Sequence, residues 1–101
     1  MTQYELTYNA LAGGRRTVTT AGTALQLSAT STICQLVQVT ALVTNTAVIF
    51  VGGSDVLTTV GSENGTPLNP GDTWEAPMQN LTQVYLDARV SGEGVSYLFF
   101  R

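Results

Sequence analysis

The chain has 101 residues, the length of one ordinary domain with a single hydrophobic core. Only 11% of the residues are charged, against about 25% in typical soluble domains, and the net charge at pH 7 is −3. Histidine and lysine are absent, and the acidic balance disfavours nucleic-acid binding, because phosphate affinity needs clustered basic residues. We therefore expect a protein that is not an enzyme and has no nucleic-acid partner.

The sequence also argues against a signal peptide, a membrane span, a disulfide and a carboxylate site. The first residues lack the basic and apolar regions of a signal peptide, and no apolar run approaches the roughly 20 residues of a membrane span. Cys34 is the only cysteine, which excludes an intrachain disulfide, and beside Ile33 and Leu36 it is expected to be a small buried residue. No carboxylate spacing matches a calcium loop or a catalytic pair. We expect no cofactor, no metal and no membrane contact.

The residue types favour strands throughout the chain. β-branched and aromatic residues are frequent, and no window shows helical periodicity. Gly, Asn or Pro interrupts the chain about every eight to twelve residues, as in sandwiches and barrels of short strands. This pattern predicts an all-β, antiparallel β-sandwich.

The N-terminal part, residues 1–14, is expected to be a strand or arm followed by a glycine-rich linker, ahead of a sandwich domain at residues 15–101. Tyr4, Leu6 and Tyr8 alternate with polar residues, as in a strand with one apolar face. Residues 11–14 are read as the linker. The strand either belongs to the sandwich or pairs with a neighbouring subunit.

The following strands are expected at residues 16–20, 23–28, 33–43 and 47–51. The long run places four apolar residues on one face: Val37, Val39, Ala41 and Val43. Residues 47–51 are apolar on both faces, which fits the centre of a sandwich or a strand whose outer face a partner covers.

The section from 52 to 71 is rich in loop residues. We expect a short edge strand at 55–59 and a core anchor at Leu68. Residues 69–72 (NPGD) have the sequence of a type II turn, with proline second and glycine third. A strand at 73–76 then carries the only tryptophan, Trp74, which fits a core or subunit interface better than a sugar-binding site.

The C-terminal part is read as a hairpin of residues 84–90 and 95–100 around a loop at 91–94. Apolar residues occupy the even positions from 84 to 90 and form its buried face. Asp87 and Arg89 share the other face and are expected to form an ion pair. Tyr85 lies on that face too and is a candidate contact to a partner protein.

Five segments, taken in order, resemble small virion proteins of tailed bacteriophages. They are residues 20–28 (TAGTALQLS), 48–52 (VIFVG), 68–72 (LNPGD), 84–88 (VYLDA) and 91–97 (SGEGVSY). The similarity covers residues 18–101 and leaves out the first seventeen. It implies a β-sandwich of jelly-roll type, as used in capsid decoration, head-fibre and tail-associated proteins, and it implies no catalytic residues.

The resemblance leads us to expect a non-enzymatic capsid decoration (cement) protein, made in the host cytoplasm and placed on the capsid surface of the virion. Its partners would be the phage major capsid protein and further copies of itself, with a trimer as the first expectation. The alternative is a head-fibre or tail-tip module that binds host-surface glycan.

Strand edges carry few protecting residues, because lysine is absent and all three prolines fall between residues 67 and 77. We therefore expect copies of the chain or a host lattice to cover them. Arg15-Arg16 is the only basic pair, either a solvated loop or a contact. The candidate partner and oligomer contacts are the loops at one end of the sandwich and Tyr4, Leu6, Tyr8, Arg15, Arg16, Trp74 and Tyr85.

Overall fold

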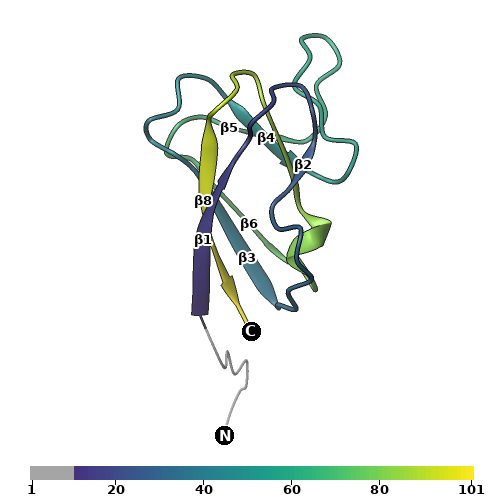
Figure 1. Ribbon diagram of the computed structural model, residues 1–101, viewed down its shortest axis with the longest axis vertical. Helices are drawn as coiled ribbons and strands as arrows, with labels where there is room; N and C mark the ends of the chain where they lie inside the picture. Colours follow the sequence, from purple (N-terminus) through teal and green to yellow (C-terminus); the bar gives the residue numbers. More distant parts are fainter. Residues whose placement is uncertain (1–10) are drawn as a thin grey trace, which may run out of the picture.

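The computed structural model describes residues 11–101, which form two antiparallel four-stranded sheets (Figure 1). Sheet A has the order β1-β8-β3-β6 and sheet B the order β2-β7-β4-β5. The strands are β1 Leu11–Thr17, β2 Leu25–Gln26, β3 Leu36–Ala41, β4 Ile49–Gly52, β5 Thr66–Leu68, β6 Thr73–Pro77, β7 Tyr85–Ala88 and β8 Gly94–Phe100. A single 3₁₀ turn, η1, spans Leu81–Gln83. The predicted all-β antiparallel class is confirmed.

The core consists of the inward-facing apolar residues of both sheets. Val37, Val39 and Ala41 of β3 are fully buried, as their alternation predicted. They lie in one cluster with Ile49 of β4 and Leu86 of β7 from the other sheet. Burial of these side chains is the main source of stability.

Strand β4 is buried on both faces, as its sequence predicted. Ile49 and Val51 belong to the core cluster, and Phe50 is only 5% exposed on the opposite face. The Arg89 guanidinium lies 5.7 Å from the centre of the Phe50 ring. Side chains of the same chain therefore bury the ring, and no second subunit is needed for it.

The predicted C-terminal hairpin is wrong. β7 belongs to sheet B, between β2 and β4, whereas β8 belongs to sheet A, between β1 and β3. The segment 89–93 crosses from one sheet to the other. Both strands have one buried apolar face, and placing them in different sheets lets those two faces line the core from opposite sides.

The predicted glycine-rich linker at Leu11–Gly14 is also corrected, because these residues are the first half of β1. They pair with β8 in the register Leu11–Phe100 to Gly14–Tyr97. Ladder pairing with β8 outweighs the low strand propensity of glycine here. The sandwich therefore includes Leu11–Gly14 as well as the residues from Arg15 onward.

Two smaller predictions about the middle of the chain are wrong. Residues 55–59 form no strand, and Leu57 makes a single bridge to Asn64. Val43 and Val90, expected on buried faces, are 79% and 41% exposed, because β3 and β7 end before them.

Two other predictions in this region are confirmed. Leu68 is buried in the core. In the 69–72 turn, Gly71 has φ 88° and the Asp72 amide donates to the Asn69 carbonyl at 2.8 Å.

Candidate interaction surfaces

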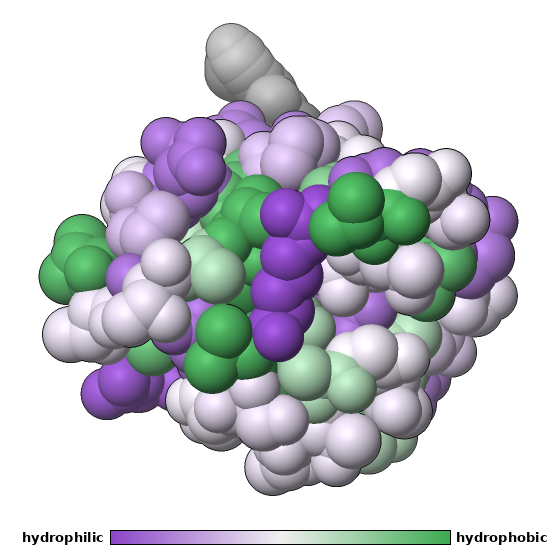
Figure 2. All heavy atoms as spheres, turned by 90° about the horizontal axis from the view of Figure 1, so that it is seen from above, coloured by the Kyte–Doolittle hydropathy of each residue, from purple (hydrophilic) through white to green (hydrophobic). Residues whose placement is uncertain are grey.

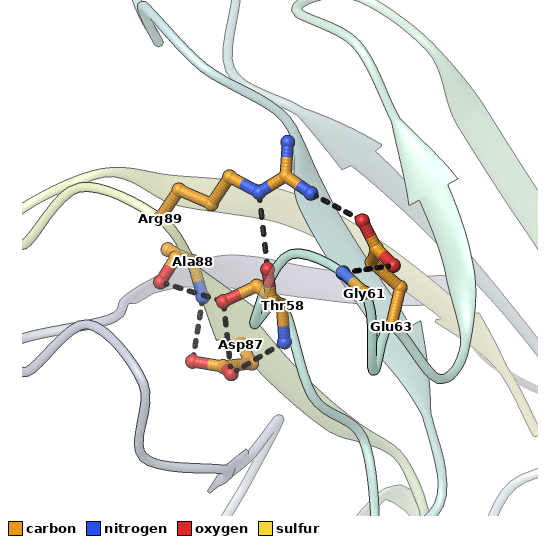
Figure 3. A network of polar contacts seen from close by, with 6 residues as sticks. All are labelled: Thr58, Gly61, Glu63, Asp87, Ala88 and Arg89. Carbon is orange, nitrogen blue, oxygen red and sulfur yellow. Dashed lines mark hydrogen bonds and ion pairs between the residues drawn. The ribbon is translucent and has the colours of Figure 1, made fainter.

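Buried carboxylates fix the loops at one end of the sandwich. Asp87 of β7 is fully buried on the outer side of sheet B (Figure 3). One of its oxygens accepts hydrogen bonds from the Gly22 and Ala88 amides, each at 2.9 Å. The other accepts from the Thr58 amide at 3.1 Å and the Thr58 hydroxyl at 3.2 Å. Asp87 thus connects the 19–24 and 53–65 loops to β7.

Glu93 has the same role for the turn between β3 and β4. Its carboxylate accepts hydrogen bonds from the Thr46 hydroxyl and amide and from the Ala47 amide. The hydrogen bond from the Thr46 hydroxyl, and after it the one from the Thr46 amide, lowers the pKa of Glu93 below the ordinary range. The buried Asn45 side chain donates to the Gly94 carbonyl at 2.8 Å and accepts from the Gly94 amide at 3.1 Å.

The predicted pair between Asp87 and Arg89 does not form. Arg89 instead makes an ion pair with Glu63 at 3.1 Å, and its Nε donates to the Thr58 carbonyl at 3.1 Å (Figure 3). Arg89 stays on the outer side of sheet B, over the Phe50 ring, but the Asp87 carboxylate accepts hydrogen bonds from the Gly22, Thr58 and Ala88 amides instead. The pKa of Glu63 is lowered by hydrogen bonds from its own amide and that of Gly61, and by the charge of Arg89.

The loops held in this way carry exposed apolar side chains. Val43, Val60 and Val90 come from three different loops and are 79%, 80% and 41% exposed. Figure 2 looks onto this end of the molecule and shows hydrophobic residues as separate groups among hydrophilic ones. We call the surface made by loops 42–48, 58–63 and 89–93 the loop end.

A second candidate surface is the open edge of sheet A at β1. Within residues 11–101, this seven-residue strand pairs with β8 alone, and every residue except Arg16 is exposed. The Val18 amide donates to the Glu93 carbonyl, and its carbonyl accepts from the Gly92 amide. By alternation, the backbone groups of Gly14 and Arg16 point to β8, whereas those of Arg15 and Thr17 point outward.

The outer face of sheet A is hollowed next to β1. The hollow has a volume of about 340 Å³, and Gly13, Gln38, Ser96 and Leu98 are among its lining residues. Gly13 contributes no side chain to it, and the Leu98 side chain beside it is 40% exposed. The hollow is open, Tyr97 is also among its lining residues, and none of the lining residues is an acid or a base of the Asp, Glu, Lys or Arg type.

The structure places the predicted contact residues as follows. Tyr4, Leu6 and Tyr8 lie outside the described residues. Arg15 is exposed on the outer face of sheet A, and the Arg16 Nε donates to the Gln26 carbonyl of sheet B at 2.9 Å.

The two predicted aromatic contacts are not brought together. Trp74 of β6 is half-buried and packs against the core from the inner face of sheet A. Tyr85 of β7 is half-buried on the outer side of sheet B, on the same side as Asp87. The chain therefore does not build one aromatic surface from these two residues.

Other reactive groups are sparse. Cys34 is buried, as predicted; its thiol donates to the Met78 carbonyl at 3.2 Å, and burial raises its pKa. Among residues 11–101, no three acidic or cysteine side chains are grouped as metal ligands would be. In the same part of the chain, no helix has the length and apolarity to cross a membrane.

The loop-fixing residues Asp87 and Glu93 were missed by sequence reasoning, which assigned Asp87 to an exposed ion pair. The donors of Asp87 lie up to 65 residues away in the sequence, so no local spacing reveals them. Comparisons with known proteins add no relative: no family model, no curated protein and no solved structure matches the chain.

Proposed function

We propose that this chain is a structural protein of a tailed-phage virion, and specifically a capsid decoration protein that binds the major-capsid shell. The observation that carries the proposal is the strand order, β1-β8-β3-β6 facing β2-β7-β4-β5. It adds to the sequence resemblance described above. The activity is non-covalent binding, and the place of action is the outer capsid surface.

The strand order supports assigning the sandwich to the jelly-roll type. Early strands pair with late ones: β1 with β8, β2 with β7, β3 with β6 and β4 with β5. Such nested pairing is what results when a long antiparallel ribbon is rolled into two sheets. Jelly rolls of eight strands occur in viral capsid and lectin domains, so the fold agrees with a virion role without proving it.

The loop end supports binding to a protein surface. Its apolar residues sit on loops that Asp87 and Glu93 hold in place, so little conformational entropy is lost when a partner covers them. Val43 and Val60 are the most exposed of these residues. We propose that they insert into the capsid shell, and that the N-terminal residues act as an additional arm.

Glycan binding by a head-fibre or tail-tip module is less well supported. It depends on an exposed aromatic cluster, yet Trp74 packs against the core and Tyr85 lies on the other sheet. Tyr97 is among the residues that line the hollow of sheet A, but it is half-buried and packs against the core. We therefore prefer the capsid decoration role to glycan binding.

The test is binding to purified capsids that lack the protein. We expect the chain to sediment with such capsids, and electron microscopy of the saturated particles to place it on their outer surface with the loop end inward. Val43→Ser combined with Val60→Ser should weaken this binding by about a hundredfold, because burial of each valine side chain contributes about 1.5 kcal/mol and each 1.4 kcal/mol is a factor of ten.

Ile33→Ser is the matched control. Ile33 is also exposed, at 69%, but it bridges to Asn80 near η1, away from the loop end. It should leave capsid binding unchanged. Location on the tail, or binding to glycan with no binding to capsids, would overturn the proposal.

A further inference from the structure

We infer that copies of this chain associate head to tail through the two open edges of sheet A, with β1 of one copy pairing with β6 of the next. The inference goes beyond the proposed function and develops the expectation that copies of the chain cover its strand edges. It does not rest on the capsid as the partner.

The two edges are free in the described chain. Within residues 11–101, β1 pairs with β8 only and β6 with β3 only. A long open edge is a template for another strand, and natural proteins normally protect it with lysine, a bulge or an inward charge. Neither edge has a lysine, and Pro77 stands only at the last position of β6. The one inward charge is Arg16 of β1, whose Nε donates to the Gln26 carbonyl of the same chain.

The strand directions permit the pairing. Neighbours in sheet A are antiparallel throughout, so β1 and β6 run in opposite directions. Placing β6 of a second copy beside β1 therefore extends the sheet as an antiparallel ladder. Inner and outer faces are preserved across the junction.

Backbone groups and register agree with this arrangement. The Asp72 carbonyl accepts from the Ala41 amide of β3 at 2.9 Å, so alternation directs the backbone groups of Glu75 to the open edge. Those of Arg15 point outward from β1 for the same reason. Arg15 opposite Glu75 of the next copy would form a pair that exchanges both backbone hydrogen bonds.

The charges of the two edges are complementary. β1 carries Arg15 and Arg16 and no acid, whereas β6 and the turn before it carry Glu75 and Asp72 and no base. In the sheet, Arg15 stands in the row of Ser96 and Thr40, and Glu75 stands beside Gln38, both on the outer face. The proposed register therefore sets opposite charges face to face, which favours this pairing over β1 with β1 or β6 with β6.

The sizes of the side chains also fit the proposed register between β1 and β6. On the inner face, Trp74 stands at the open edge of β6, half-buried and with no strand beyond it. The same register places it beside Arg16 of the next copy, and Ala76 beside Gly14, which has no side chain. A contact of this kind uses two different surfaces, so it closes into a ring, such as a trimer, or continues as a chain.

Sedimentation velocity over a range of concentrations tests the inference. We expect the wild-type chain to form species heavier than the 10.7 kDa monomer. Arg15→Glu and Glu75→Arg should each raise the dissociation constant by about tenfold, because like charges then face each other. The double variant Arg15→Glu/Glu75→Arg restores an opposite pair and should recover most of the affinity.

Asp55→Arg is the control for Glu75→Arg, because Asp55 is an exposed acid in the loop between β4 and β5 and the change in net charge is the same. Arg15→Pro removes an outward amide without removing a β1–β8 hydrogen bond and should abolish association. Circular dichroism of each variant verifies that the sandwich is retained.

A wild-type monomer at every concentration would overturn the inference. So would association that Glu75→Arg leaves unchanged, which would indicate β1 pairing with β1. Capsid binding by a monomer would leave the proposed function standing while this inference fails, and a ring that ignores capsids would do the reverse.

Discussion

Removal of the Asp87 carboxylate tests how the loop end is held. In Asp87→Ala, the Thr58 and Ala88 amides lose their hydrogen-bond acceptor, while the Gly22 amide and the Thr58 hydroxyl keep a longer contact to the Ala88 carbonyl at 3.3 and 3.4 Å. All of these groups surround a side chain with no exposed surface. The variant therefore leaves two buried amides without this acceptor and weakens the hydrogen bonds of two other donors.

The cost follows from these contacts. A buried donor left without an acceptor costs about 1–3 kcal/mol, and each weakened bond to a charged acceptor adds about 1 kcal/mol. With two such amides and two weakened bonds, we expect the free energy of unfolding to fall by about 4 kcal/mol or more, a large share of the 5–15 kcal/mol typical of one domain. Asp87→Asn keeps one acceptor oxygen and should cost less.

Urea unfolding followed by the fluorescence of Trp74 measures this loss. With a slope of about 2 kcal/mol per molar, the midpoint should fall by about 2 M. Asp55→Ala removes an exposed aspartate and should change stability by less than about 0.5 kcal/mol. If Asp87→Ala unfolds no more easily than Asp55→Ala, the network does not hold the loops.

Three further outcomes are expected. Leu86→Ala, in the core, should lower the free energy of unfolding by about 3–5 kcal/mol, whereas Leu98→Ala, on the outer face, should lower it by less than about 1 kcal/mol. Thermal unfolding of the two variants measures the difference, and equal losses would contradict the assignment of the core. The lowered pKa of Glu93 means that its contribution to stability is present above the ordinary pKa of glutamate and is lost as the pH falls through the folded value. Glu93→Gln should therefore be less stable at neutral pH and lose less stability on acidification, as urea midpoints at several pH values would show; an unchanged acid dependence would argue against it. Arg89→Ala removes the cover of the Phe50 ring and the hydrogen bond to the Thr58 carbonyl as well as the ion pair. It should destabilise more than Glu63→Ala, which removes the ion pair and the acceptor of the exposed Gly61 amide, and equal losses in urea would mean that the ring and Thr58 contacts contribute nothing.

Local patterns of the sequence determined the strand content of this protein and much of its core. The alternation at Val37, Val39 and Ala41 identifies the buried face of β3, because side chains of a strand point alternately to its two sides. The turn at residues 69–72 was equally predictable, since Pro70 and Gly71 each fix a backbone angle. The basic pair on β1 was singled out, although its place on an open sheet edge was not.

Only the tertiary structure decided which strands pair and which polar groups are buried. β7 and β8 are neighbours in the sequence but lie in different sheets, because the burial of both apolar faces is a property of the whole sandwich and not of a hairpin. The position of Asp87 in a strand gives no sign of burial, since its donors at Gly22 and Thr58 arrive from distant loops. The sequence shows that charged residues are few, but it does not show where in the fold they lie. The fold adds that two of the few charges are buried to hold loops, and that others stand on the two open edges of sheet A.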